Sequence, residues 1–212
     1  MTDGLPALKE ADALRADIYR LLATLLRQAP DADLLTWLAE LAIEQDGSQL
    51  AKRWQALADA AAAMDKSGDG VAPLQRAHFR HLVGVIQGDV VPYASWYRNG
   101  ELMEAALVAL RQDLRALGFE RSEHTRDPED HLAALCEVMA MLIESESHEQ
   151  AYFFSQHIAP WAASCFDDLG QVDTAFYAAL GTLGSAYVES ERSSLSIDAD
   201  HAPVRIIERK RG

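Results

Sequence analysis

The chain has 212 residues, 49% of them hydrophobic, and its 33 acidic against 19 basic side chains give a net charge of −14. This length favours a single domain, and the acidic balance argues against nucleic acid as a partner because like charges repel. No stretch reaches the roughly 18 consecutive apolar residues that a membrane-spanning helix needs, so we expect no stable membrane insertion.

Two sequence features favour the cytoplasm. Residues 1–10 have neither the basic start nor the continuous apolar core of a secretory signal peptide. The two cysteines, Cys136 and Cys165, stand in apolar surroundings and are too few for a zinc ribbon or a disulfide framework. Buried free thiols in a reducing compartment are the expected state, so we predict a cytoplasmic protein.

Apolar residues recur at spacings of three and four along most of the chain, which is the pattern of amphipathic helices. Residues 85–100 form the one long irregular stretch, since glycine and proline interrupt it. Only residues 83–91 and 196–207 could form strands. Helices are predicted over 7–28, from a cap at Asp31 through Leu41, over 49–64, after Pro73 through Val83, from Leu102 to Gly118, from Asp127 to about Glu144, over 148–167 and over 171–193.

These elements predict an all-α fold, a single-domain multi-helix bundle. The helical domain is expected to cover residues 1–198. Residues 199–212 are expected to form a loosely ordered basic C-terminal tail, since residues 205–211 carry four basic side chains against one acidic.

The densest polar motif is Asp127-Pro128-Glu129-Asp130-His131, which stands directly before an apolar stripe that starts at Leu132. Asp127 can cap a helix, and proline suits the first helical position. The carboxylates that follow suit the positive end of the helix dipole. His131 should point to the core edge, where its ring nitrogens need partners. Two interpretations stay open: a capped helix with a hydrogen-bonded core-edge histidine, and a polar clasp at a binding groove.

Two further features permit either a structural or a binding role. Residues 120–150 contain nine acidic and two basic residues, which fits a solvated helix face or the docking of a basic segment. Tyr93, Trp96 and Tyr97 follow Pro92 closely. They fit packing over the bundle or the wall of a peptide groove, because such side chains combine apolar area with a polar group.

Motifs for catalysis or metal binding are missing. His78 and His81 share one helix face, but the chain has no Glu-x-x-His pair for a di-iron site and no His-Glu-x-x-His motif. Glycine-rich phosphate-binding loops and the Gly-x-Ser-x-Gly nucleophile motif are absent too. We therefore predict no metal, no cofactor and no enzymatic activity.

Three stretches stand in a recognisable order. They are residues 92–97 (Pro-Tyr-Ala-Ser-Trp-Tyr), residues 127–132 (Asp-Pro-Glu-Asp-His-Leu), and residues 153–161 (Phe-Phe-Ser-Gln-His-Ile-Ala-Pro-Trp). The second is close to a Glu-Pro-x-Asp-His pattern and the third to Phe-x-x-x-His-Ile/Leu-x-x-Trp. In this order they resemble the TorD/DmsD-type chaperones that mature redox enzymes. The likeness spans roughly residues 10–195 and extends to Arg15, Tyr19 and Leu22 in the first helix and to Glu189 and Glu191 in the last.

The resemblance implies an all-helical, cytoplasmic bundle of the TorD-like type. Members of this family bind the N-terminal twin-arginine signal peptide of a molybdenum-containing oxidoreductase. They hold the apo enzyme back from export until cofactor insertion and folding are complete. The expected partners are therefore the signal peptide and the apo oxidoreductase. The chaperone itself would be a monomer or a domain-swapped homodimer, with residues 85–100 as the hinge.

The same resemblance assigns site residues. Asp130 and His131 would form the binding pair, and Pro128 would set the turn before them. The aromatic side chains of residues 92–97 would line the site: Tyr93, Trp96 and Tyr97. Aspartate at 127 replaces the family's glutamate, and its shorter side chain leaves a binding role for Asp127 open.

Two other classes of function remain. One is a helical metal-binding protein or enzyme that uses four histidines: His78, His81, His131 and His157. Iron or zinc bound in stoichiometric amount would favour it. The other is a helical adaptor that binds a folded partner and ignores signal peptides.

Overall fold

The computed structural model describes residues 9–44, 46–66, 70–85, 87–100, 105–120 and 128–201. In these residues the chain is helical, with two π-helical segments (η1 and η2) and no strand. The elements are, in chain order, α1 (Glu10–Arg27), α2 (Ala32–Ala39), α3 (Gln49–Asp65), α4 (Val71–His78), η1 (Phe79–Val83), α5 (Ala94–Asn99), α6 (Ala105–Ala116), α7 (Leu132–Glu144), α8 (Gln150–Phe153), η2 (Phe154–Ile158), α9 (Ala162–Leu169) and α10 (Ala175–His201).

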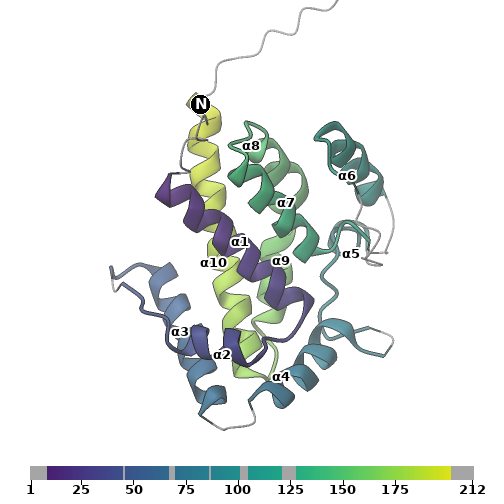
Figure 1. The fold of residues 1–212 in the computed structure, drawn as a ribbon. Coiled ribbons are helices and arrows are strands. Elements are labelled where there is room, and N and C mark those ends of the chain that lie inside the picture. Colours follow the sequence, from purple (N-terminus) through teal and green to yellow (C-terminus); the bar gives the residue numbers. More distant parts are fainter. Residues whose placement is uncertain are drawn as a thin grey trace, which may run out of the picture.

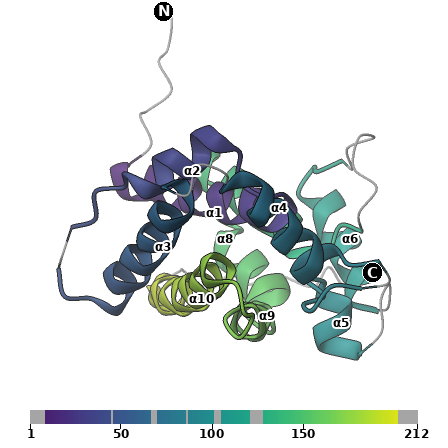
Figure 2. The ribbon, with the colours of Figure 1, turned by 90° about the horizontal axis from the view of Figure 1, so that it is seen from below.

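The long helix α10 runs through the molecule, and other helices pack along it (Figure 1). It lies between α3 and α9 when the molecule is seen from below (Figure 2). α1 packs along α7, and α2 packs on α3, while α5 and α6 lie together at one edge. Most of these helices contribute to one hydrophobic core, so the predicted all-α, single-domain bundle is confirmed.

The core has its densest part where α1 meets α7. α7 is apolar around most of its circumference, and such a helix is stable only when other elements surround it. Its buried residues are Leu132, Ala133, Leu135, Cys136, Val138, Met139, Ala140, Leu142 and Ile143. α1 is amphipathic and buries one stripe against it: Ala16, Ile18, Tyr19, Leu22, Ala23, Leu25 and Leu26.

A buried ion pair ties the first helix to the last. Nε and Nη2 of Arg15 donate to the two carboxylate oxygens of Glu191 at 2.8 and 2.9 Å. The hydroxyl of Tyr19 donates to the same carboxylate at 3.2 Å. The hydrogen bond to Glu191 raises the pKa of Arg15. Three of the family-like residues, Arg15, Tyr19 and Glu191, therefore meet in one cluster, which holds α1 against α10.

Two glycines let α10 approach α9 closely. A Cβ at Gly184 would lie 2.3 Å from the ring of Phe166, and one at Gly181 would lie 2.3 Å from the backbone nitrogen of Gly170. Neither position has room for a methyl group without a shift of its neighbour. The interface therefore depends on glycine despite the cost that glycine has inside a helix.

Each π-helical segment contains a buried histidine that contacts an aspartate. In η1, Nδ1 of His81 lies 2.7 Å from Oδ2 of Asp89. In η2, Nε2 of His157 lies 2.7 Å from Oδ2 of Asp113. π-Helical turns are rare and occur often at functional sites. His157 thereby joins two segments distant in sequence, whereas His81 contacts Asp89 only eight residues further on and reaches a distant segment through Thr174.

The helix start expected at Asp127 is wrong. α7 begins at Leu132, and His131 is its N-cap. Pro128 precedes a turn rather than opening the helix, and Asp127 lies outside the described residues. The reason is tertiary: the backbone of Asp130 and His131 pairs with residues 92–94, which keeps it extended until Leu132.

Other expected boundaries also change. Residues 85–100 are not irregular throughout, because α5 forms over Ala94–Asn99, and the described residues of the possible strand at 83–91 form none. The helix expected over 148–167 is divided into α8, η2 and α9, with a turn at Pro160. α10 continues to His201, so residues 196–201 are helical and not a strand. Residues 202–212 of the expected tail lie outside the described residues.

Candidate functional site

The loop before α5 and the turn before α7 lie side by side. The N–H of Leu132 donates to the carbonyl of Pro92 at 2.8 Å, and the N–H of Ala94 donates to the carbonyl of Asp130 at 3.0 Å. Tyr93 and His131 form an isolated antiparallel bridge between these bonds. Two motifs that are far apart in sequence thus share one junction, as a common site requires.

Asp130 is the chemically unusual residue of this junction. Its side chain is fully buried, with 0% of its surface exposed. Oδ2 accepts a hydrogen bond from the backbone N–H of Ser95 at 2.9 Å. Oδ1 is buried and has no hydrogen-bond partner among the described residues. A buried carboxylate oxygen without a donor is unfavourable, so this oxygen is a strong acceptor for a donor that arrives from outside.

His131 stands beside this carboxylate and is 7% exposed. Its Nδ1 accepts from the N–H of Ala133 at 3.0 Å, which caps α7. In the neutral ring the proton is therefore on Nε2, which makes Nε2 a donor. The ring packs edge-on against that of Tyr93, with 4.9 Å between the centroids. The capping and the binding interpretations of His131 are therefore compatible.

The other aromatic residues of the predicted site divide between two places. Trp96 leaves 37% of its side chain at the surface. Tyr97 stacks on Trp161 with ring centroids 5.6 Å apart, and its hydroxyl donates to Asp168 at 2.6 Å. Burial raises the pKa of this hydroxyl. Tyr97 thus fastens α5 to α9, whereas Tyr93 contacts His131 directly.

Sequence reasoning missed two contributors to the junction. The first is Ser95, which binds Asp130 through its backbone N–H, so its side-chain type carries no signal. The second is Arg111 on α6, whose guanidinium lies 2.8 Å from the carboxylate of Glu129. This hydrogen bond raises the pKa of Arg111. Of the two neighbouring carboxylates, Glu129 forms the ion pair with Arg111, whereas Asp130 interacts with the same guanidinium only electrostatically.

Arginines also neutralise part of the acidic stretch over residues 120–150. Glu137 forms an ion pair with Arg27 at 3.0 Å, and Glu144 pairs with Arg20. Both arginines come from α1. These carboxylates hold α7 against α1, so they stabilise the bundle rather than form a free acidic surface for a partner.

The histidines of the metal-binding alternative have other roles. Nε2 of His78 contacts the carbonyl of Leu26 at 3.2 Å, and Nε2 of His81 contacts Oγ1 of Thr174 at 2.8 Å. His157 contacts Asp113. Burial lowers the pKa of His78 and of His157. The described residues include no group of three or more His, Cys, Asp or Glu that could hold a metal ion, so the alternative has no support there.

The two cysteines are buried free thiols, as the sequence predicted. Burial raises the pKa of both. Among the helices of the described residues, none combines the length and the apolar character needed to cross a membrane.

Comparison with known proteins identifies the family. The family model described as nitrate reductase delta subunit matches residues 43–167, which is more than half of the chain. The chain belongs to this family. The nitrate reductase delta subunit family includes the TorD-type chaperones, so the predicted kinship is confirmed.

Two curated relatives align with most of this chain and with most of their own length. The chaperone protein TorD of Vibrio cholerae is 25% identical over 211 residues, which cover 89% of this chain and 94% of TorD. The Tat proofreading chaperone DmsD of Salmonella typhimurium is 26% identical over 190 residues, covering 87% of this chain and 92% of DmsD. A crystal structure of a redox enzyme maturation protein from Archaeoglobus fulgidus aligns over 86% of this chain and 94% of its own, with a TM-score of 0.49 and 16% identity. Like TorD and DmsD, the protein of 212 residues described here is a chaperone rather than an enzyme.

Proposed function

We propose that this chaperone binds the N-terminal twin-arginine signal peptide of a molybdenum-containing oxidoreductase in the cytoplasm. It holds the apo enzyme back from export until the cofactor is inserted and folding is complete. The observation that carries the proposal is the buried Oδ1 of Asp130, which has no hydrogen-bond donor among the described residues.

An arginine of the signal peptide fits this oxygen chemically. A guanidinium has five N–H donors in a planar fork, and its hydrogen bonds to a carboxylate are among the strongest in proteins. Oδ2 of Asp130 is already held by Ser95, so the carboxylate is fixed in orientation before the peptide arrives. A pre-organised acceptor loses little conformational entropy on binding.

The apolar part of the peptide would contact the aromatic side chains at the same junction. Tyr93 lies against His131, and Trp96 is partly exposed one turn further along α5. Such side chains supply large apolar area at a low cost in conformational entropy. A twin-arginine signal has a basic start followed by an apolar segment, so the junction offers a complement to each part.

The relatives support the same function. DmsD of Salmonella typhimurium is named a Tat proofreading chaperone, and two of the three stretches that carry the resemblance, residues 92–97 and 127–132, meet at the junction through residues 92–94 and 130–132. Because Glu129, Glu137 and Glu144 have arginine partners, we assign specificity to Asp130 itself rather than to the acidic stretch as a whole.

Calorimetric titration of the purified chain with a synthetic twin-arginine signal peptide tests the function. We expect saturable binding of one peptide per chain. A peptide with both arginines replaced by lysine should bind at least about tenfold more weakly, because an ammonium is a compact, strongly hydrated point charge, whereas a guanidinium is more weakly hydrated and presents several N–H donors in a rigid plane. Equal affinity for the two peptides, or no binding of either, would contradict the proposal.

We expect the chaperone to be a monomer or a domain-swapped homodimer. The hinge for an exchange would be residues 85–100, which follow η1 and include α5. Sedimentation of the chain at several concentrations distinguishes the two states, because an exchanged dimer dissociates slowly on dilution.

A further inference from the structure

At the junction, the chain itself supplies an arginine to one of two adjacent carboxylates. Nε and Nη2 of Arg111 on α6 donate to Oε2 of Glu129 at 3.1 and 2.8 Å. The side chain of Arg111 is 34% exposed and that of Glu129 is 16% exposed, whereas Asp130 is fully buried. The guanidinium of Arg111 also interacts electrostatically with Asp130. One internal cation therefore serves both carboxylates, and its pair with Glu129 is the part that solvent reaches.

Two adjacent carboxylates match the two adjacent guanidiniums of a twin-arginine motif in number and in charge. Oδ1 of Asp130 has no donor among the described residues, and in the proposed function it accepts one of the two arginines. Glu129 is bound to Arg111, so the other arginine can bind it only by exchange. Such an exchange replaces one guanidinium–carboxylate contact with another of the same chemistry, so little contact energy is lost.

The exchange depends on tethering. Arg111 belongs to the same chain as Glu129, so its effective concentration at that carboxylate is on the order of millimolar. A lone peptide arginine at micromolar concentration does not compete with it. Once one arginine of the peptide is bound to Asp130, its neighbour is tethered as well. Only two consecutive arginines can therefore compete with Arg111 on similar terms.

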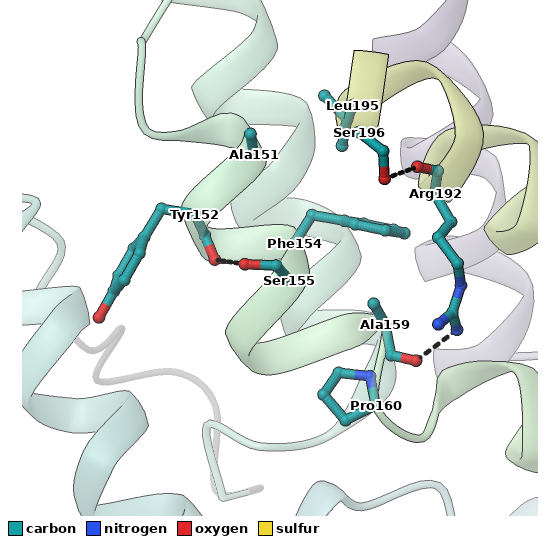
Figure 3. A pocket seen from close by; sticks show the side chains of 9 residues that line it. All are labelled: Ala151, Tyr152, Phe154, Ser155, Ala159, Pro160, Arg192, Leu195 and Ser196. Atoms are coloured by element: carbon teal, nitrogen blue, oxygen red, sulfur yellow. Dashed lines mark hydrogen bonds between the residues drawn. The ribbon is translucent and has the colours of Figure 1, made fainter. Parts of the chain in front are cut away.

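Release of Arg111 does not require α6 to leave the bundle. Two residues further along α6, Oδ2 of Asp113 lies 2.7 Å from Nε2 of His157 and accepts from the hydroxyl of Tyr152 at 3.3 Å. Figure 3 shows the ring of Tyr152 turned away from the other labelled side chains. Leu110 of the same helix lies in the hydrophobic core. The side chain of Arg111 can therefore turn into solvent while α6 stays in place.

We propose that Arg111 is an internal competitor for the second arginine of the signal peptide. It occupies Glu129 in the free chaperone, and it is displaced when one peptide arginine binds Asp130 and the adjacent one binds Glu129. Its return to Glu129 shortens the lifetime of the complex, which suits a chaperone that must release its client. This inference rests on the proposed function and adds to it the site of the second arginine and a means of release.

Dissociation of labelled signal peptides from the full chain tests the competition. Three peptides are compared, which carry Arg-Arg, Arg-Gln or Gln-Arg at the twin-arginine position. Arg111→Gln should slow dissociation of the Arg-Arg peptide about fivefold, as expected for the loss of a partly exposed competing ion pair. The two single-arginine peptides should change by no more than about twofold, because only the screened charge of Arg111 acts on them.

The comparison separates competition from a structural role. An ion pair that only supports the junction would alter the dissociation of all three peptides alike, so equal changes, or no change, would overturn the inference. The matched control is Arg20→Gln, which removes an exposed ion pair with Glu144 between α1 and α7. It should leave dissociation of the Arg-Arg peptide within about twofold of the wild type. An equal effect of Arg20→Gln would show that only the net charge matters.

A second background tests the contested acceptor. In Glu129→Gln the carboxylate is absent, so adding Arg111→Gln should change dissociation of the Arg-Arg peptide by less than about twofold, as a double-mutant cycle predicts for a direct coupling. A fivefold effect of Arg111→Gln that persists in this background would overturn the assignment of the second arginine to Glu129.

Brief modification with phenylglyoxal, a reagent for guanidinium groups, reports the displacement in the wild-type chain. With saturating Arg-Arg peptide, Arg111 should react at least about threefold faster, because it has lost a pair of this strength. The single-arginine peptides should leave its rate unchanged. Unchanged or slower modification with the Arg-Arg peptide would overturn the exchange. Failure of that peptide to bind the wild type would overturn the proposed function as well, whereas the other contrary results would overturn this inference alone.

Discussion

The carboxylate of Asp130 accepts the backbone N–H of Ser95 at 2.9 Å and so fastens the start of α5 to the start of α7. One oxygen of this carboxylate is structural, and the other is the acceptor that we assign to the signal peptide. Structural and binding roles of the same side chain can be separated by substitutions that remove different properties.

Asp130→Asn should reduce binding while it preserves the fold. The amide oxygen can still accept from Ser95, so the free energy of unfolding should change by less than about 1 kcal/mol. Loss of the charge-assisted hydrogen bond should weaken twin-arginine peptide binding by about tenfold to a hundredfold. Urea unfolding and calorimetry measure the two quantities.

Asp130→Ala is the matched comparison. It leaves the N–H of Ser95 without its acceptor, which should cost about 1–3 kcal/mol of stability. Combined with His131→Ala it should also weaken peptide binding while the helical circular dichroism spectrum persists. Wild-type affinity in Asp130→Asn would show that the free oxygen has no role in recognition.

Glu191→Ala should strongly destabilise the bundle. The substitution leaves Arg15 partly buried without its bidentate partner and removes the acceptor of Tyr19. Breaking a buried ion pair costs about 3–5 kcal/mol when the remaining charge has no partner; because Arg15 is partly exposed and keeps its ion pair with Asp12 at 2.9 Å, the expected loss lies at or below the lower figure. Chemical denaturation monitored by circular dichroism gives the value.

Glu144→Ala is the control for this pair. Glu144 binds Arg20 with both side chains more than 40% exposed, and exposed pairs contribute less than about 1 kcal/mol. Similar losses for the two substitutions would contradict the stabilising role assigned to the ion pair of Arg15 and Glu191.

The stability of the protein should fall as the pH drops below the ordinary histidine pKa. Burial lowers the pKa of His157 from 6.5 despite the contact with Asp113. The unfolded chain therefore binds a proton at a higher pH than the folded one. This favours folding above pH 6.5, and the advantage is lost as the pH falls through the lower folded pKa. Thermal unfolding between about pH 7.5 and pH 5.5 shows the dependence.

His157→Gln should reduce this loss of thermal stability on acidification, because it removes a buried imidazole whose pKa is lowered. His148→Gln, at an exposed position, should leave the pH dependence unchanged. Identical curves for His157→Gln and the wild type would show that another group dominates the acid response.

The thiols of Cys136 and Cys165 should not react with a disulfide reagent in the native protein. Both side chains are buried, and burial raises their pKa, which lowers the thiolate fraction. Two equivalents should react at once in denaturant. Rapid labelling of either thiol in the native state would show that the α7–α9 region opens.

Gly184→Ala should destabilise the packing of α10 on α9 by about 1–3 kcal/mol, the usual cost of overpacking, since its Cβ would meet the ring of Phe166. Ser185→Ala on the same helix should change the unfolding free energy by no more than about 0.5 kcal/mol. A stability gain in Gly184→Ala, as helix propensity alone would predict, would contradict the close approach.

Much of the secondary structure could be predicted from periodicity and helix ends. α1, α3 and α6 end near the residues expected, and Asp31 caps α2 through Leu34 as predicted. Such features depend on residues close in sequence, so local rules suffice. The start of α7 could not be predicted in this way, because its alternative partner, residues 92–94, lies in another part of the chain.

By itself, the sequence determined the helical class, the acidic character and the order of the family motifs, because each of these depends on residue type and spacing. Only the tertiary structure decided that Tyr93 meets His131, that Tyr97 turns instead to Asp168, and that Arg15 finds Glu191. It also decided which carboxylates receive arginine partners and which oxygen of Asp130 has no donor among the described residues. These contacts join segments distant in sequence, and their formation depends on how the helices pack around a shared core.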